Sequence, residues 1–364
     1  MSQIEVEIRS GLEGLESMAM EWPALTGSAE NAGFEHSHGA FLAALKYRLA
    51  DPSVTRCAVL RRGPGSVVGI CPLVPVRRRI RRLGFPAWDL PRDPDRPTSS
   101  FVLAGIPPDG ALGALQGILS RDAPGPCLLS LPRVEQGSPT WRLLRQAPAE
   151  SLFSMPSGSA IRIPTVEDAG SRIAGLSQKF RQNLRRGWRM LEEAGKPVYR
   201  VAREVGEVGE ALERFLGLEA AGWKGSSAQG HAIRSDPALL AYVRGTTGLL
   251  AARSQCHVHE LRAGDRLVAS LICFLGSGEA YAFKIAHDES LRRAAPGHLL
   301  LQRVLEDYGR APAVRALAGG PEAGWWSPWR PEVTPLHAVY VGLGGVKSRL
   351  ALALLRAGRQ GSAQ

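Results

Sequence analysis

The chain has 364 residues, which is too long for one ordinary hydrophobic core and predicts two domains. Hydrophobic residues make up 44% of it and charged residues 22%, which is typical of a globular protein and excludes a low-complexity or fibrous class. The net charge of +11 favours an anionic partner, which leaves open a nucleic acid, a nucleotide-bearing cofactor, an acidic carrier protein or a membrane surface.

The N-terminal sequence and the cysteines indicate the compartment. The apolar stretches are shorter than the roughly 18–20 residues that span a bilayer. The N-terminus carries early acidic residues and lacks an apolar signal region. We therefore expect a soluble, cytoplasmic protein without stable membrane insertion. The cysteines form no CxxC pair, so we expect buried, reduced thiols, with no disulfide framework and no metal site.

A helical pattern followed by a hairpin pattern occurs first near the N-terminus. Between Glu21 and Leu49, apolar side chains recur on one helical face, among them Phe41 and Leu45. From Thr55 to Val76, two strand-like runs flank a glycine-containing turn, which predicts a β-hairpin.

The same order recurs later in the chain. Helical spacing is found from Ser177 to Glu193 and from Val205 to Trp223. The segment from Cys256 to Asp288 then predicts a second hairpin and a further strand. Its run from Leu267 to Leu275 has no polar face, which places it in the middle of a sheet. The repetition indicates an internal duplication.

Proline, serine and glycine are mixed between Pro132 and Pro164, which indicates the domain boundary. We expect an N-terminal domain of residues 1–150 and a C-terminal domain of residues 151–364 that carries the chemistry.

The segment after the strand Glu279 to Asp288 suits a phosphate. Pro296 fits the first position of a helix, and Gly297 leaves the backbone amides there uncovered by its own side chain. Arg292 and Arg293 add positive charge just before that helix. Free N–H groups and the helix dipole could hold a pyrophosphate, or the pattern is a plain helix start.

Four side chains are candidates for proton transfer or for orienting the reactants. Glu219 falls on the apolar stripe of its helix, where a carboxylate tends to have a raised pKa and could act as a base. Alternatively, Glu219 is solvated at the edge of the stripe or pairs with a nearby arginine. His231, in a polar loop, is a second candidate base. Lys284 lies in an apolar strand and should reach an acid such as Asp288 or Glu219, or face a ligand.

Two arginine-rich runs and a tryptophan cluster complete the candidate set. Arg77 to Arg82 and Ser177 to Arg189 are basic and are either solvated faces or surfaces for a phosphate-bearing partner, including RNA. Trp325, Trp326 and Trp329 form either a lid over a sheet edge or a wall for an acyl or sugar substrate.

Several of these motifs together carry a family resemblance. Lys179-Phe180-Arg181, Gly222-Trp223-Lys224-Gly225, the run Phe283 to Asp288 and the run Pro296 to Leu300 resemble the CelD/BcsL-type acetyltransferases. These form a branch of the GNAT superfamily that is distantly related to the Fem-type aminoacyl transferases.

The resemblance implies an α/β (α+β) fold with two tandem GNAT-like domains, each a mixed, mostly antiparallel sheet flanked by helices. It implies that acetyl-CoA or another acyl-CoA donates the acyl group without a metal. The acceptor would be an amine or hydroxyl, often on a saccharide or envelope precursor in polysaccharide biosynthesis. The implied cofactor-binding residues are Arg292, Arg293, Pro296, Gly297, His298 and Leu299.

For the remaining roles we expect Glu219, Lys284, Asp288 and His231 to be catalytic. We expect Trp223, Lys224, Tyr281 and Trp326 to contact the acceptor. Two alternatives stay open. One is a Fem-like transfer from an aminoacyl-tRNA held by the Ser177 to Arg189 run, and the other is a non-catalytic protein that binds a carrier or a polysaccharide assembly.

Overall fold

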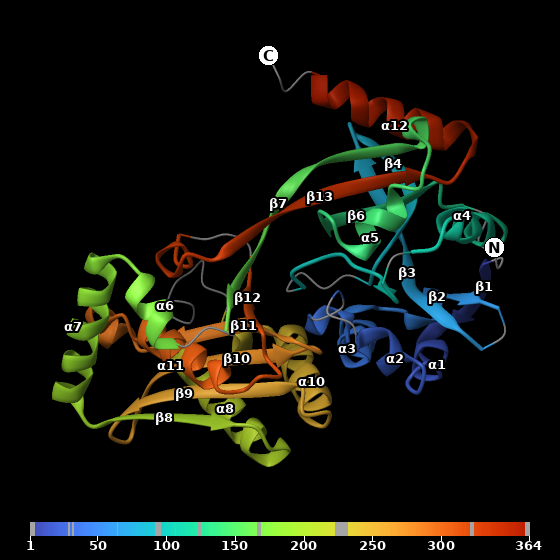
Figure 1. The fold of residues 1–364 in the computed structure, drawn as a ribbon. Coiled ribbons are helices and arrows are strands. Elements are labelled where there is room, and N and C mark those ends of the chain that lie inside the picture. Colours follow the sequence, from blue (N-terminus) through green and yellow to red (C-terminus); the bar gives the residue numbers. More distant parts are fainter. Residues whose placement is uncertain are drawn as a thin grey trace. The chain divides into compact units, whose positions relative to one another are not determined.

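Two compact units make up the fold seen in the computed structural model of the chain (Figure 1). The first unit comprises Met1–Ala160 and Thr334–Gln364, and the second comprises Ile161–Val333. The structure describes residues 4–27, 30, 33–63, 65–91, 96–105, 107–122, 125–165, 169–222, 232–320 and 324–360.

The first unit is built on a mixed sheet with the strand order β1-β2-β3-β4-β6-β13-β7. The pairs β1–β2, β2–β3, β3–β4 and β6–β13 are antiparallel, whereas β4 and β6 run parallel with Trp88 opposite Leu129. The strands are β1 (Ile4–Ser10), β2 (Arg56–Arg62), β3 (Val67–Ile80), β4 (Leu83–Asp89), β5 (Val102–Leu103, paired with β3), β6 (Leu128–Glu135), β7 (Leu152–Pro164) and β13 (Glu332–Gly342).

Helices of the first unit pack their apolar sides into a core with this sheet. Phe41 and Leu45 of α3 are buried there, as their spacing predicts, together with Trp22 and Trp88. The helices are α1 (Gly11–Glu16), α2 (Trp22–Thr26), α3 (His38–Arg48), α4 (Ala111–Asp122), α5 (Pro139–Leu144) and α12 (Gly345–Gln360), with short 3-10 helices η2 (Phe34–His36), η3 (Pro52–Val54) and η4 (Ala149–Ser151).

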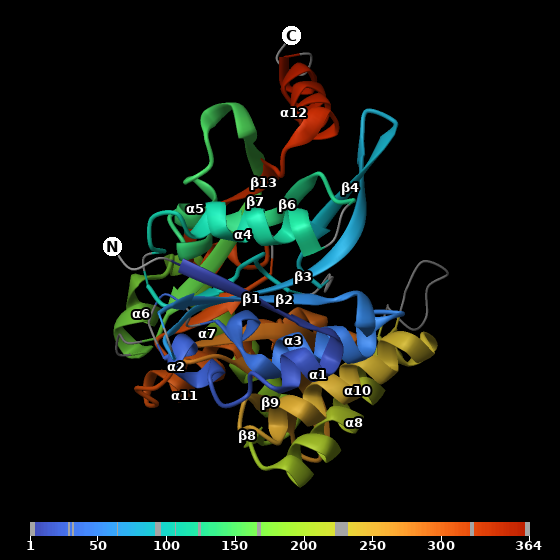
Figure 2. The ribbon, with the colours of Figure 1, turned by 90° about the vertical axis from the view of Figure 1, so that its right-hand side faces the viewer.

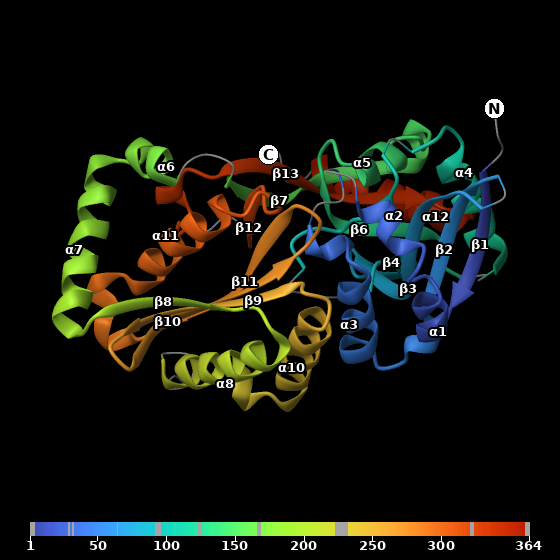
Figure 3. The same cartoon turned by 60° about the horizontal axis from the view of Figure 1, so that its bottom comes forward.

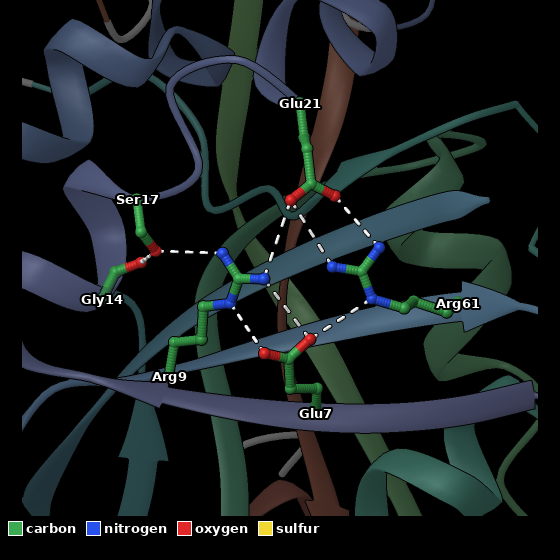
Figure 4. Close-up of polar contacts among 6 residues, drawn as sticks. All are labelled: Glu7, Arg9, Gly14, Ser17, Glu21 and Arg61. Carbon is green, nitrogen blue, oxygen red and sulfur yellow. Dashed lines mark hydrogen bonds and ion pairs between the residues drawn. The ribbon is translucent and has the colours of Figure 1, made fainter. Parts of the chain in front are cut away.

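A four-residue charge network ties the edge strand β1 to its neighbours (Figure 4). Glu7 contacts Arg9 at 2.8 Å and Arg61 at 3.3 Å, and Glu21 contacts Arg61 at 3.0 Å. Arg9 also donates to Ser17 Oγ at 2.9 Å, and Ser17 Oγ donates to the Gly14 carbonyl at 2.8 Å. Because β1 has only β2 beside it, these side-chain contacts reinforce an otherwise half-paired strand.

The second unit has its own mixed sheet, in the order β7-β12-β11-β10-β9-β8. Its strands pair antiparallel except β11 and β12, which run parallel. The run from Leu267 to Leu275 lies in β10, in the interior of the sheet as predicted. The strands are β8 (Pro197–Ala202), β9 (Cys256–Ala263), β10 (Arg266–Leu275), β11 (Glu279–His287) and β12 (Ala316–Gly319).

Helices cover both faces of this second sheet (Figure 3). On one face α8 packs against β9, β10 and β11, with α10 beside it. On the other face α11 packs against β9, β10 and β11, and α7 packs against α11. The helices are α6 (Ala169–Gly175), α7 (Gln178–Ala194), α8 (Val205–Ala221), α10 (Pro237–Ala251) and α11 (Pro296–Gly309), with η5 (Ile233–Ser235), η6 (Glu289–Ala294) and η7 (Ser327–Trp329).

The two units repeat one strand pattern. In each, an antiparallel hairpin leads to a third antiparallel strand, and a helix-containing connection then leads to a parallel neighbour. That connection contains α4 between β4 and β6, and α11 between β11 and β12. The predicted α/β class, with mixed and mostly antiparallel sheets flanked by helices, is therefore confirmed.

The grouping of the C-terminal residues differs from the expected division at residue 150. Residues 334–364 belong to the first unit. The physical reason is strand pairing, because Leu336 of β13 lies opposite Glu135 of β6 and Gly342 lies opposite Leu128. Ile161 to Pro164 of β7, in turn, pair with β12 of the second unit.

The free cysteines are all buried, and burial raises the pKa of the Cys57 and Cys273 thiols to about 12.

Among the described helices, none is long and apolar enough to cross a membrane.

A buried polar network lies beneath the C-terminal end of α11. The Tyr199 hydroxyl is 2.8 Å from Nδ1 of His259, and the Tyr308 hydroxyl is 2.9 Å from Nε2 of the same ring. The Tyr308 hydroxyl is also 3.2 Å from Nδ1 of His257. Burial lowers the pKa of His257 to about 4 and that of His259 well below its usual value, so both rings are neutral near pH 7.

This network predicts acid sensitivity of the fold. The folded state lowers the pKa of His257, so its contribution to stability is present above the unfolded pKa near 6.5 and is lost as the pH falls toward about 4. We expect the wild type to lose about 2 kcal/mol more than His257→Asn in its free energy of unfolding between pH 7 and pH 5. Urea denaturation at both pH values measures this, and parallel losses in the two proteins would contradict it.

Candidate functional site

The strands β11 and β12 separate part-way along the sheet of the second unit. Their parallel pairing covers only Glu279 to Tyr281 of β11, which lie opposite Ala316 to Ala318 of β12. β12 ends at Gly319, whereas β11 continues to His287. The last six residues of β11 therefore extend beyond its pairing with β12, and a strand that outruns its neighbour in this way can offer backbone N–H and C=O groups to a ligand.

A β-bulge lies at the point where the strands separate. Ile272 of β10 is opposite Lys284 of β11, but the next residue, Cys273, is opposite Ala282. Phe283 is therefore the extra residue of the bulge. Bulges re-aim side chains and are frequent beside active sites.

The bulge decides which way Lys284 faces. Without it, Lys284 would share a face with Ala282, which packs on the α11 side. With it, Lys284 shares the face of its cross-strand partner Ile272, while Ile285 packs on the α11 side. The Lys284 ammonium lies 5.2 Å from the centre of the Phe283 ring, and its side chain is half-buried.

The connection from β11 to α11 contains a strained residue. Ala295, the N-cap of α11, has φ 53° and ψ 52°, a left-handed conformation that non-glycine residues rarely adopt. This turn lets the Ala295 carbonyl accept from the N–H groups of His298, at 2.9 Å, and Leu299, at 3.3 Å. Pro296 has no N–H, so Gly297 supplies the remaining amide at the start of α11.

The predicted phosphate position at the start of α11 lies under an indole ring. Pro296 and Gly297 are buried. A Cβ built on Gly297 would lie 3.7 Å from Trp325 Cζ2 and 3.5 Å from Ile285 Cδ1. The start of α11 is therefore lined by Trp325 and Ile285. Arg292 and Arg293, by contrast, are exposed in η6 just before this point.

The aromatic cluster fixes the protonation state of His298. Trp329 Nε1 donates to His298 Nδ1 at 3.1 Å, and the Trp325 ring stacks on His298 at 5.1 Å. Burial, and secondarily the charge of His287, lower the pKa of His298 to about 4. Its ring is therefore neutral near pH 7, and with Nδ1 accepting, the proton is on Nε2.

Trp326 packs against the end of β12. A Cβ built on Gly319 would lie 2.6 Å from Trp326 Cζ2, so only glycine allows this indole to lie against the end of β12. Tyr281 is buried near the same strand end, and its hydroxyl lies 3.8 Å from a Cβ built on Gly320. Tyr281 and Trp326 are the two predicted acceptor-contacting residues that the structure describes, and both lie where β11 and β12 separate.

The basic helix α7 crosses the start of α11 at Gly187. A Cβ built on Gly187 would lie 2.4 Å from the Ala294 carbonyl oxygen and 3.2 Å from Leu299. The predicted inward stripe is confirmed, since Phe180, Leu184 and Leu191 are buried. This close backbone approach sets the arginines of α7 beside those of η6.

These two segments form a basic surface, here called the α7–η6 surface. Its cations are exposed, and in the part of the chain that the structure describes none of them has a recorded ion pair. Its members are Lys179, Arg185, Arg186, Arg189, Arg292 and Arg293. Nearby, Arg303 lies over the Trp188 ring at 4.5 Å but also pairs with Glu306 at 2.7 Å.

Glu219 is a buried carboxylate on α8, 4% exposed, and is not solvated at the edge of the stripe. Its Oε2 accepts from the Ile233 N–H at 2.9 Å. That bond joins the end of α8 to the start of η5, across the segment that contains Trp223, Lys224 and His231. These three predicted site residues lie outside the described residues.

Asp288 caps η6. It accepts from the N–H and the hydroxyl of Ser290, at 3.0 and 2.8 Å, and from Arg266 Nε at 2.6 Å. Burial alone would raise its pKa, but the Ser290 and Arg266 contacts outweigh burial and lower the pKa. His287 Nε2 lies 3.4 Å from Glu289 Oε1 at the same corner.

Some features of this region were missed from the sequence. The bulge at Phe283 and the contact of Gly187 with Ala294 depend on partners remote in the chain. The alternation His257-x-His259 in a buried strand, in contrast, was a signal that could have predicted the network with Tyr308. Within the described residues, no group of three or more His, Cys, Asp or Glu side chains could hold a metal ion.

A separate cavity of about 460 Å³ lies at the β8 edge of the sheet. Its lining includes the ion pair of Arg214 with Glu260, at 2.7 Å. Two strands, β9 and β10, separate β8 from β11. The residues that the sequence singled out do not line this cavity.

Comparisons with known proteins concern the fold of the second unit and of the chain as a whole. Residues 178–320 match the family model of the acetyltransferase (GNAT) domain, from the start of α7 to the end of β12. Over this stretch the second unit is similar to a GNAT-type domain. A search by sequence finds no match among curated proteins.

Solved structures share the fold across most of the chain. FemX has a TM-score of 0.57 at 10% identity, covering 89% of this chain and 96% of that one. The C-terminal domain of a putative lysylphosphatidylglycerol synthetase from Agrobacterium fabrum has a TM-score of 0.54 at 11% identity, covering 95% and 97%. L-PGS from Bacillus licheniformis has a TM-score of 0.50 at 10% identity, covering 96% and 98%. At these identities the likeness shows the fold alone.

Proposed function

We propose that the second unit transfers an acyl group, in the first instance acetyl, from acyl-CoA to an amine or hydroxyl acceptor. The acceptor class we favour is a saccharide or envelope precursor, as the resemblance to CelD/BcsL-type enzymes implies. The observation that carries the proposal is the strand β11, which leaves β12 after Tyr281 inside the segment that matches the GNAT domain.

In this proposal the thioester lies along the open side of β11. The acceptor's nitrogen or oxygen adds to the thioester carbonyl, and the carbonyl oxygen becomes an oxyanion. A backbone N–H of β11 near the Phe283 bulge donates to that oxyanion. The carbon–sulfur bond then breaks, the acyl group stays on the acceptor, and the CoA thiolate leaves and takes a proton. Alignment and preorganised donors supply most of the acceleration, so no covalent nucleophile is required.

Arg292 and Arg293 are the groups we assign to the donor's pyrophosphate. Both are exposed beside α7 and without a recorded ion pair in the described chain. Guanidinium groups suit phosphate oxygens because they donate two parallel hydrogen bonds. Pro296, Gly297, His298 and Leu299 then shape the end of the donor site. The neutral His298 keeps a donor at Nε2 without a charge that would be costly beneath Trp325.

For proton transfer we assign Glu219 as the base, with Lys284 orienting the acceptor. Glu219 is buried on α8, and α8 packs against β11 on the face toward which the bulge turns Lys284. Asp288 stays a candidate, although its oxygens already accept from Ser290 and Arg266. Trp223, Lys224, Tyr281 and Trp326 are proposed to contact the acceptor, and His231 is a second proposed base.

A Fem-like transfer from an aminoacyl-tRNA is the second candidate. The α7–η6 surface favours it, since four of its exposed cations lie on one helix and two more lie beside Gly187. A surface of this kind neutralises several backbone phosphates at once, more than one CoA molecule carries in its pyrophosphate.

The donor assignment predicts that acetyl-CoA binds and that Arg293→Ala weakens binding about 10-fold or more, because a hydrogen bond to a charged group contributes about 1.5–3 kcal/mol. Isothermal titration calorimetry measures both. Arg253→Ala is the matched control, since Arg253 lies just beyond α10 on the other face of the sheet and bonds the Leu249 carbonyl at 3.0 Å. A wild type that takes up no acetyl-CoA would remove the CoA donor.

The base assignment predicts that Glu219→Gln lowers kcat about 100-fold or more in a steady-state transfer assay, because an amide cannot accept the acceptor's proton. The amide oxygen of glutamine still accepts from the Ile233 N–H, so the contact with η5 is retained. Activity of Glu219→Gln near the wild-type level, with loss only in Glu219→Ala, would instead assign Glu219 a purely structural role.

The tRNA alternative predicts steep salt dependence. If tRNA is the donor, filter binding should weaken linearly with the logarithm of salt, and Arg185→Ala/Arg186→Ala should reduce the slope by about 2. In that case acetyl-CoA should give no heat of binding. Salt-insensitive or absent tRNA binding counts against this alternative and leaves the acyl-CoA proposal unaffected.

A further inference from the structure

The C-terminal helix α12 has two apolar sides. One side packs on the first unit, with Ser348, Ala351 and Leu352 buried. The opposite side carries Val346, which is 73% exposed, and Leu350, which is 48% exposed, followed at helical spacing by the exposed Ala353 and Ala357. A helix that has already buried one face has no folding reason to keep a second apolar stripe in water.

The β3–β4 hairpin presents cations at its tip. Arg77, Arg79, Arg81 and Arg82 are exposed, and Leu83 beside them is 50% exposed. The two-residue loop Arg81-Arg82 joins the pair Ile80 and Leu83. Both loop residues have positive φ, 44° and 72°, where Asn-Gly is the preferred sequence. Two arginines therefore occupy a turn whose backbone is better suited to other residues, which points to a role for their charge.

These two elements lie side by side in the first unit. A Cβ built on Gly358 of α12 would lie 3.6 Å from Arg81 Nε. Figure 2 shows the end of the β3–β4 hairpin rising at the same end of the unit as α12. We call the exposed side of α12 together with the hairpin tip the α12–hairpin surface.

The charge of the α12–hairpin surface is of one sign. Neither Val67–Trp88 nor Gly345–Gln360 contains an acidic residue, and Asp89, which ends β4, is buried and paired with Arg78. Arg356 is held by the Ala149, Glu150 and Leu152 carbonyls. Among the described residues no ion pair is recorded for the other cations of the surface, which are Arg77, Arg79, Arg81, Arg82, Lys347 and Arg349.

We propose that the α12–hairpin surface binds the surface of an anionic lipid bilayer. Segments that anchor a protein at a membrane interface combine exposed leucine and valine with nearby cations. The apolar side chains enter the boundary of the acyl chains, and the cations contact the lipid headgroups. Each such cation contributes about 1 kcal/mol near an anionic surface. A nucleic acid would use the cations and leave Val346 and Leu350 in water. A second copy of this chain would bring like charges together.

The binding is peripheral and leaves the fold intact. The inward side of α12 stays packed on the first unit, so lipid contact needs no unfolding of the helix. The proposal uses only residues of the first unit and does not depend on the acyltransferase assignment.

The test is co-sedimentation of the full chain with vesicles of phosphatidylcholine, with and without phosphatidylglycerol. We expect binding only when phosphatidylglycerol is present, and weaker binding as salt is raised. Arg81→Asn/Arg82→Gly should weaken it about 30-fold, because two contributions of about 1 kcal/mol are lost. That variant should keep or raise the melting temperature, since Asn-Gly suits the turn. Leu350→Glu should also weaken binding.

The matched control is Lys46→Asn/Arg62→Asn, which also removes two exposed positive charges. Arg62 lies at the other end of β3 from the hairpin tip, roughly 40 Å away along the strand. This control should bind as the wild type does. No binding to anionic vesicles, or equal binding by folded Arg81→Asn/Arg82→Gly, would overturn the proposal. So would light scattering that shows a dimer lost in Leu350→Glu, or RNA binding without vesicle binding.

Discussion

The separation of β11 from β12 is the constraint on which the rest of the second unit depends. Two parallel strands that stay paired offer a ligand no backbone groups, whereas strands that part after three residues leave the longer one open on one side. The bulge at Phe283 coincides with the parting, because an extra residue turns the strand and interrupts its ladder. The connection through η6 and α11 then returns the chain to β12, and its length allows the helix to begin beside the open part of β11.

Two glycines allow the groups around this opening to approach. Gly187 lets α7 contact the Ala294 carbonyl, and Gly319 lets Trp326 pack at the end of β12. In each case a Cβ would meet backbone or a tightly packed side chain. The two arginines of η6 are exposed, and they directly precede Ala294 and the start of α11 in the chain.

The sequence predicted the regular helices and strands better than it predicted the bulge in β11 or the pairing of β13. Periodicity was sufficient for α7 and for the interior strand β10, because each repeats one environment along its whole length. Strand alternation correctly places Lys284 on the face opposite Ile285, but alternation alone does not reveal the bulge, which separates the face of Lys284 from that of Ala282. The exchange of β13 into the first unit could not be predicted, since the strand pattern of Glu332 to Gly342 is equally compatible with either sheet. A local sequence pattern predicts that a segment forms a strand, but its position in a sheet depends on the strand with which it pairs.

The net charge of +11 does not reveal that the chain has two basic surfaces of different chemical composition. On the α7–η6 surface the exposed residues next to the cations are polar, such as Gln182 and Asn183. That composition suits phosphates in water. The α12–hairpin surface carries exposed leucine and valine as well as cations, and these apolar side chains gain free energy only on leaving water. Salt would weaken an ionic interaction at either surface, but an apolar contribution at the second would not fade with screening. The residual affinity at high salt would therefore distinguish the two proposed interactions even before any residue is changed.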